Sequence, residues 1–309
     1  MLYWLAKRLL QLPITLFFLV TLAFFMMRMA PGGPFSSDKN LDPAIEAALL
    51  AKYNLDKPLK EQYITFLGNL LQGDLGPSFI QKSKTVNEII LTTLPTSLLL
   101  GIFAILIALA IGLMAGIFAA LYRGKTIDYF AMVLAVIGLS LPAFVIGPIF
   151  QLLFTMFLPI LPTAGYHGIV EPSYLILPSL TLGLPFAARI ARLSRGGMLE
   201  VLHQDYIKTA RARGLSESRV ILGHALKGAL VPVASYLGPA IAAVTTGSLV
   251  VEKIFQVPGL GREFVEAALN RDYTLAMGTV IIYGSLLILM NLLSDLLSAW
   301  MDPRLRGQI

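Results

Sequence analysis

The sequence predicts an all-α polytopic membrane protein with six transmembrane helices. Of its 309 residues, 56% are apolar and only 14% are charged, whereas about 25% of the residues in a soluble domain are charged. Because a helix needs about 20 apolar residues to cross ~30 Å of hydrocarbon, a long uncharged stretch is a candidate span. Three stretches lack any charged residue, and they lie between Glu88 and Arg123, between Asp128 and Glu171, and between Lys227 and Glu252.

The first predicted span is the apolar run Leu9–Ala30, which follows Lys7 and Arg8. A cleaved signal peptide has an apolar region of about 7–15 residues and ends in a small-x-small site. This run is longer, and Arg28 stands where a small residue would be needed. We therefore expect an uncleaved first helix.

Local signals predict that the segment 31–95 is folded. Asp42 before Pro43 is typical of an N-cap followed by proline at the first helical position. A second helix is expected after Pro58, with apolar residues at i, i+3 and i+4 spacing, and Gly73 is its expected stop.

Thr85 and Glu88 have the spacing of a capping box, which predicts a helix that leads into the second span. Pro178 and Pro185 interrupt the fourth apolar run, and Arg189 ends it. The five further spans are predicted at Ser97–Leu121, Tyr129–Leu158, Ser173–Ile190, Val231–Val251 and Thr274–Ser294.

The distribution of positive charge predicts the orientation in the membrane. Basic residues are concentrated in the segments expected on the same side of the membrane as the N-terminus. These segments contain the pairs Lys7 and Arg8, Arg123 and Lys125, and Arg304 and Arg306, together with the longer loop 189–230. Both termini are therefore expected in the cytoplasm of a bacterium, with residues 1–95 supplying the first helix and a folded extracytoplasmic segment. Residues 96–309 are expected to form a core of five transmembrane helices with a cytoplasmic loop at 198–231. This topology accounts for the net charge of +6 without a nucleic-acid partner.

The sequence offers no residues for catalysis or for binding a metal. There is no cysteine and no G-x-S-x-G motif. Gly124-Lys125-Thr126 resembles the end of a phosphate-binding loop, but the position of that loop's first glycine is occupied by Ala119. The histidines are too scattered for a zinc site, at positions His167, His203 and His224. We expect neither an enzyme nor a nucleotide-binding chain.

Ionisable residues inside spans would favour an ion-coupled secondary transporter. The candidates, Arg28 and Asp295, both lie near span ends, where a long or terminal side chain reaches the interface. Secondary transport therefore remains a distant alternative, as does a membrane scaffold that transports nothing.

The most informative segment follows the fourth span. Asp205 is predicted to cap a short helix at Tyr206–Arg213, which Gly214 ends in a left-handed conformation. Ser216 is predicted to cap a second helix, with Glu217 in its first turn, where the helix dipole favours a carboxylate.

This segment resembles the E-A-A-x-x-x-G motif of permease subunits in ABC-type importers. Lys208 stands at the Glu position, Thr209 and Ala210 stand at the two Ala positions, and Gly214 matches. The downstream part of the family motif, I-x-L-P, matches poorly, since a proline appears only at Pro232. The variant T-A-R-A-x-G-L resembles the peptide and nickel branch of the family.

The resemblance extends over nearly the whole chain. Four further segments resemble permease subunits of oligopeptide importers, namely Phe24–Gly32, Gly73–Ser78, Asn270–Thr274 and Met301–Arg304. The resemblance implies a type I importer transmembrane domain of the MetI-like class. Oligopeptides are its implied cargo, with dipeptides or nickel as the alternative, and no substrate-contact residues are assigned.

The resemblance also implies that the motif forms a coupling helix, which docks in a groove of a cytoplasmic ATPase. The small side chains of Ala210 and Ala212 would allow the helix to approach the ATPase closely. The basic side chains of Lys208, Arg211 and Arg213 would offer positive charge to the same partner. The implied partners are a second, similar permease, two ATPases that bind ATP and magnesium, an extracytoplasmic peptide-binding protein and membrane lipid. The residues assigned to coupling are Tyr206, Lys208, Thr209, Ala210, Arg211, Arg213 and Gly214.

Overall fold

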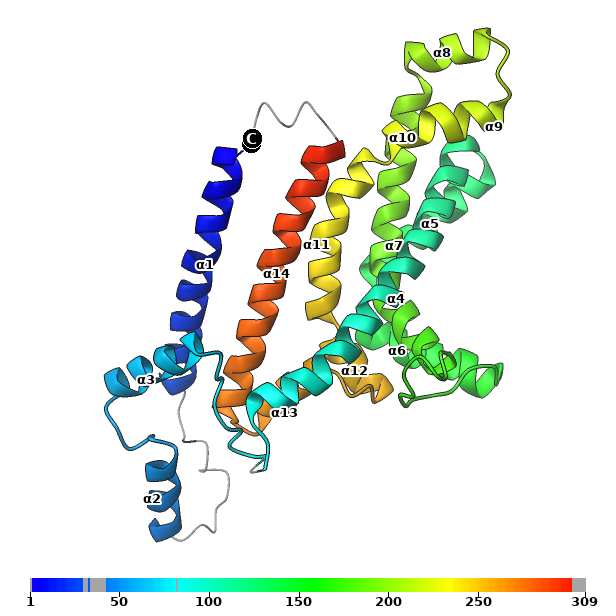
Figure 1. Ribbon diagram of the computed structural model, residues 1–309. Coiled ribbons are helices and arrows are strands. Elements are labelled where there is room, and N and C mark those ends of the chain that lie inside the picture. The colour runs from blue at the N-terminus through cyan, green and yellow to red at the C-terminus, as the bar shows by residue number, and fades with distance from the viewer. Residues whose placement is uncertain (1, 30–32, 34–42, 82, 302–309) are drawn as a thin grey trace. The chain divides into compact units, whose positions relative to one another are not determined.

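The computed structural model describes residues 2–29, 33, 43–81 and 83–301, and within these residues every regular element is a helix (Figure 1). Four helices are long and apolar enough to cross a membrane, and the number rises to six if each of two bent helix pairs forms one span. The all-α polytopic fold is thus confirmed.

The chain divides into two compact units. Unit 1 comprises 1–8, 98–257 and 286–309, and unit 2 comprises 9–97 and 258–285. Unit 2 contains most of α1 (Leu2–Met29), α2 (Pro43–Lys52), α3 (Leu59–Leu71), α13 (Leu260–Leu269) and the first parts of α4 (Val86–Leu121) and α14 (Tyr273–Met301).

Two local predictions in unit 2 are confirmed. The Glu88 carboxylate accepts the Thr85 N–H at 3.0 Å, and Thr85 Oγ1 accepts the Glu88 N–H at 3.2 Å, so the capping box forms and starts α4. Gly73 follows α3 with a φ of +77°, as a helix stop requires. The predicted cap at Asp42 lies outside the described residues.

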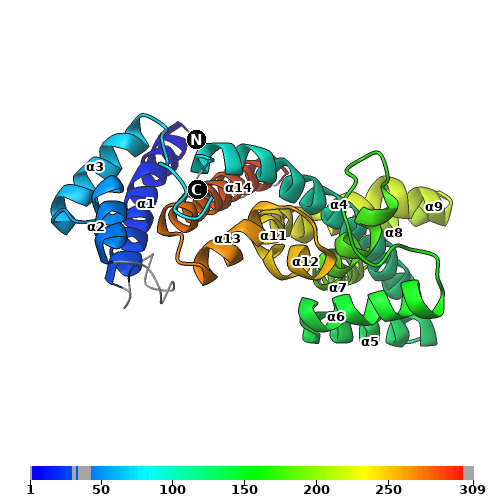
Figure 2. The ribbon, with the colours of Figure 1, turned by 90° about the horizontal axis from the view of Figure 1, so that it is seen from below.

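The third predicted span is broken in the structure. It consists of α5 (Thr126–Ser140) and α6 (Ala143–Gln151), with a π-helix continuing to Phe157, and the two parts meet at 111°. Pro142 accounts for the break, because proline disfavours helical conformation in the residue before it, and Leu141 is extended. Figure 2 shows α5 and α6 beside α7 within unit 1.

The helix of the fourth predicted span does not end near Arg189. Helix α7 (Ser173–Leu202) passes through both prolines and continues beyond Ile190 to Leu202. Its buried face simply continues, through Ala191, Ser194 and Met198. The arginines lie on its other faces, so packing against neighbouring helices outweighs the local charge signal.

Small residues bring α4 and α7 close together. A Cβ atom added at Gly183 of α7 would lie 2.6 Å from the Ala104 carbonyl of α4, and one at Gly112 of α4 would lie 2.6 Å from the Ala187 carbonyl of α7. Both distances are too short for a real side chain. Glycine therefore allows the backbone contact that packs transmembrane helices without large side chains between them.

The remaining elements of unit 1 are α8 to α12 and the second part of α14. α11 (Val231–Gly247) and α12 (Leu249–Phe255) together cover the fifth predicted span, with a break at Ser248. The core of unit 1 gathers buried side chains from α4, α7, α11 and α12, including Leu100, Leu177, Val244 and Phe255.

Candidate functional site

The segment that follows α7 folds into a compact helical loop, which lies beyond the end of that helix (Figure 1). It contains α8 (Asp205–Ala212), α9 (Glu217–Val220), a π-helix at Ile221–Ala225 and α10 (Leu226–Ala229). Residues 203–230 lie within the predicted coupling loop 198–231, and for brevity we refer to them as the coupling loop. A helix, a glycine turn and a second helix occur in the predicted order.

An apolar cluster fixes the coupling loop to the rest of unit 1. Ile207 of α8 is fully buried, and it packs with Ala120 of α4 and Met198 of α7. Val220 and Ala225, which follow the turn, are buried in the same cluster. The loop is thus anchored on both sides of its glycine turn to α4 and α7.

The predicted coupling residues divide between two faces of α8. Ala210 is only 6% exposed and belongs to the apolar cluster, so its methyl group faces inward. The neighbouring Ala212 is exposed. The other six assigned residues are all exposed, and we call them together the outward face of α8: Tyr206, Lys208, Thr209 and Arg211 on the helix, and Arg213 and Gly214 directly after its end. This face carries three cations and an aromatic ring.

The turn after α8 has the predicted conformation at Gly214, whose φ is +76°. A Cβ atom added there would have no other atom within 4 Å, so there is room for a side chain. Glycine is favoured instead because the positive φ of this residue is a backbone conformation that other residues rarely adopt. Arg211 bridges the turn, because its guanidinium pairs with the Glu217 carboxylate at 2.8 and 3.3 Å. Ser216 is the N-cap residue of α9, as predicted, but its side chain makes no capping hydrogen bond.

The predicted cap at the start of α8 is wrong. Gln204 occupies the N-cap position, and Asp205 is already in the first turn of the helix. The Asp205 carboxylate instead accepts a hydrogen bond from Lys208 Nζ at 2.9 Å. That bond lowers the pKa of Asp205.

Two buried carboxylates in unit 1 were missed by sequence patterns. Asp128 of α5 is 3% exposed, and Glu252 of α12 is completely buried, with the Ser248 hydroxyl donating to it at 2.6 Å. Both lie at the ends of predicted spans, so the structure adds their burial rather than their position. Arg28 lies in the last turn of α1, as expected, and the Asp295 side chain lies outside the described residues.

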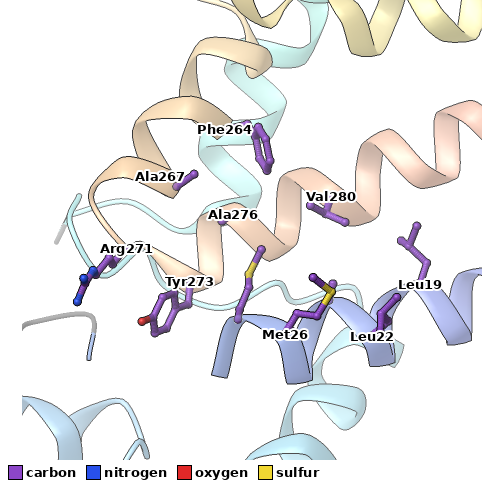
Figure 3. Close-up of a pocket in the computed structure, with 12 residues that line it drawn as sticks. Leu19, Leu22, Met26, Phe264, Ala267, Arg271, Tyr273, Ala276 and Val280 are labelled. Carbon is purple, nitrogen blue, oxygen red and sulfur yellow. The ribbon is translucent and has the colours of Figure 1, made fainter. Parts of the chain in front are cut away.

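Unit 2 contains an apolar cavity of 620 Å³ between α1, α13 and α14 (Figure 3). Leu19, Leu22 and Met26 come from α1, and Arg271 and Tyr273 lie together at one end of the cavity. Its lining is otherwise composed of aliphatic, methionine and phenylalanine side chains. Such a surface suits hydrocarbon, because it offers few hydrogen-bonding groups.

The apolar helices, long enough to cross a membrane, define an integral membrane protein. Residues 112–307 match the family described as binding-protein-dependent transport system inner membrane component, and the chain belongs to this family. It is accordingly a permease subunit of an ABC transporter family and not itself an enzyme.

Three relatives match along nearly their whole length. The oligopeptide transport system permease protein OppB of Haemophilus influenzae is 46% identical over 99% of this chain and 100% of the relative. The OppB protein of Escherichia coli K12 is 45% identical over the same shares. The dipeptide transport system permease protein DppB of Bacillus subtilis is 41% identical over 97% of this chain and 96% of the relative.

Proposed function

We propose that this chain is one permease subunit of an ATP-driven importer of oligopeptides in a bacterial inner membrane. The observation that carries this proposal is the 45–46% identity to oligopeptide permeases over their full length. Identity to the dipeptide permease of Bacillus subtilis is lower, at 41%. Dipeptide import is therefore the second candidate.

The outward face of α8 docks in a groove of a cytoplasmic ATPase. Tyr206 supplies an exposed aromatic contact, and Lys208, Arg211 and Arg213 supply positive charge. Ala210 acts indirectly, because it holds α8 on the apolar cluster. Two ATPase subunits bind ATP and magnesium, and their closure pushes the anchored coupling loop together with α4 and α7.

The remaining partners follow from the same architecture. A second, similar permease completes the translocation path, and a soluble peptide-binding protein delivers cargo on the outer face. Both termini and the coupling loop lie in the cytoplasm, and α2 and α3 lie outside. Lipid chains contact the apolar surface of unit 2, including the cavity beside α1.

Reconstitution of the complete complex in proteoliposomes tests the proposal. The complex should take up a pentapeptide in an ATP-dependent, vanadate-sensitive manner, faster than a dipeptide at equal occupancy of the binding protein. Faster uptake of the dipeptide would favour the second candidate. Uptake driven by an ion gradient without ATP, or ATP turnover by this chain alone, would overturn the assignment.

A further inference from the structure

Arg189 lies on an exposed face of α7 and makes a cation–π contact with the ring of Tyr236 of α11. Its guanidinium carbon is 5.2 Å from the ring centroid. Within the described part of the chain, no carboxylate lies within ion-pair distance of Arg189. Arg195, two turns along the same helix, is instead paired with Asp128. Arg189 is thus a cation whose charge is not neutralised by any of the residues that the structure describes.

Arg189 lies within the candidate membrane span Ser173–Leu202, several residues before its end. It lies six residues before Arg195, which corresponds to about 9 Å of helix. Arg195 marks the level at which α5 begins, because its partner Asp128 is in the first turn of α5. Tyr236 lies in the second turn of α11, a helix without charged residues. A cation at this depth is costly in lipid and is characteristic of a water-filled path.

The cation–π contact leaves the guanidinium available for an anionic ligand. The ring of Tyr236 attracts the cation electrostatically without accepting a conventional hydrogen bond, so the five N–H donors of the guanidinium are left for another partner. None of these donors forms a hydrogen bond within the described residues. A planar guanidinium can bind a carboxylate through two parallel hydrogen bonds.

We propose that Arg189, oriented by Tyr236, binds the C-terminal carboxylate of the peptide as it passes through the importer. This inference rests on the proposed function. An importer that accepts many sequences needs contacts with features that all peptides share, and an unmodified peptide always carries this carboxylate. A side-chain carboxylate is present only in some peptides, so the chain terminus is the ligand to which a single fixed cation is suited.

The test uses the complete complex in proteoliposomes and two peptides that differ only at the C-terminus. One ends in a free carboxylate and the other in an amide, and neither contains an acidic residue. Both are supplied at concentrations that saturate the binding protein, whose affinity for each is measured separately. The quantity of interest is the ratio of the initial uptake rates of the acid and the amide.

We expect the wild-type complex to take up the peptide with a free C-terminal carboxylate faster than the amidated peptide. Arg189→Gln should reduce uptake of the free-carboxylate peptide roughly tenfold, because a charge-assisted contact is lost, and should not slow uptake of the amidated peptide. Tyr236→Leu should lower the ratio in the same direction, and Tyr236→Phe should preserve it. Arg192→Gln is the matched control, because Arg192 is exposed one turn away on α7. It should leave the ratio unchanged.

Three results would overturn the proposal. The ratio could stay at the wild-type value in Arg189→Gln, or Arg192→Gln could lower it equally, which would indicate a general effect of positive charge. Arg189→Gln could abolish co-purification of the second permease, which would make Arg189 an interface residue. If the wild-type complex transports neither peptide, the proposed function itself fails, and this result is distinct from an unchanged ratio.

Discussion

Arg195 of α7 forms a two-point ion pair with Asp128 in the first turn of α5. Its Nε donates to Oδ1 at 2.6 Å and its Nη2 donates to Oδ2 at 2.8 Å. The Asp128 side chain is only 5% exposed, and Oδ2 also accepts the Gly124 N–H at 3.0 Å. The pair therefore joins the turn between α4 and α5 to the helix that leads into the coupling loop.

Asp128→Asn is expected to destabilise the protein by about 2 kcal/mol, because it leaves a partly buried guanidinium without its counter-charge. A lower apparent unfolding temperature of the purified protein would show this. The control is Asp205→Asn, since Asp205 pairs with Lys208 fully in solvent, and it should leave that temperature unchanged. Equal unfolding temperatures for Asp128→Asn and the wild type would contradict a stabilising role for the pair.

Gly214→Val is expected to impair coupling without preventing membrane insertion. A side chain at φ +76° adds strain of roughly 1–2 kcal/mol, and a β-branched one adds crowding. The strain is local, so membrane abundance should stay normal while co-purified ATPase and peptide uptake decrease. Gly214→Ala should have a smaller effect.

Gly223 provides the matched control for this variant. It is exposed in the same loop, has no positive φ, and has no atom within 4 Å of an added Cβ. Gly223→Val should therefore retain more ATPase than Gly214→Val. If both variants assemble and transport like the wild type, the turn at Gly214 does not position α8 for coupling.

Glu263→Gln in α13 is expected to stabilise the protein at neutral pH. Burial raises the pKa of Glu263, and the nearby Glu266 carboxylate raises it further, although Gln81 donates a hydrogen bond at 3.0 Å. Because the folded-state pKa lies above the unfolded value, stability that is present at low pH is lost as pH rises through the folded pKa. The neutral amide avoids this loss.

The gain in unfolding temperature from Glu263→Gln should therefore be larger at pH 7.5 than near pH 4, close to the ordinary glutamate pKa of about 4.3. Glu61→Gln in α3 serves as an exposed control and should show no such dependence. A gain that grows on acidification would have the wrong sign for this explanation.

Single cysteines test the orientation, because the chain has no native cysteine. Ser83 precedes α4 and Ser218 lies in α9, and both are exposed. In intact spheroplasts, Ser83→Cys should react with an impermeant maleimide and Ser218→Cys should react only after permeabilisation. The reverse pattern would invert the topology.

Features set by residues close in sequence were predicted from the sequence alone. The capping box needs only Thr85 and Glu88, and the left-handed turn needs only Gly214 after a helix. Apolar runs of sufficient length likewise mark the spans, because crossing hydrocarbon demands them whatever the neighbours are. The capping box and the glycine turn are completed within about one helical turn, so tertiary packing has little influence on them.

Features that depend on which helices meet were decided only by the tertiary structure. Asp128 and Arg195 are 67 residues apart, and Arg189 meets Tyr236 only because α7 packs beside α11. The inward orientation of Ala210 depends on the cluster beneath α8. Periodicity gives the faces of one helix, but the partner of each face follows from long-range packing, which local sequence does not encode.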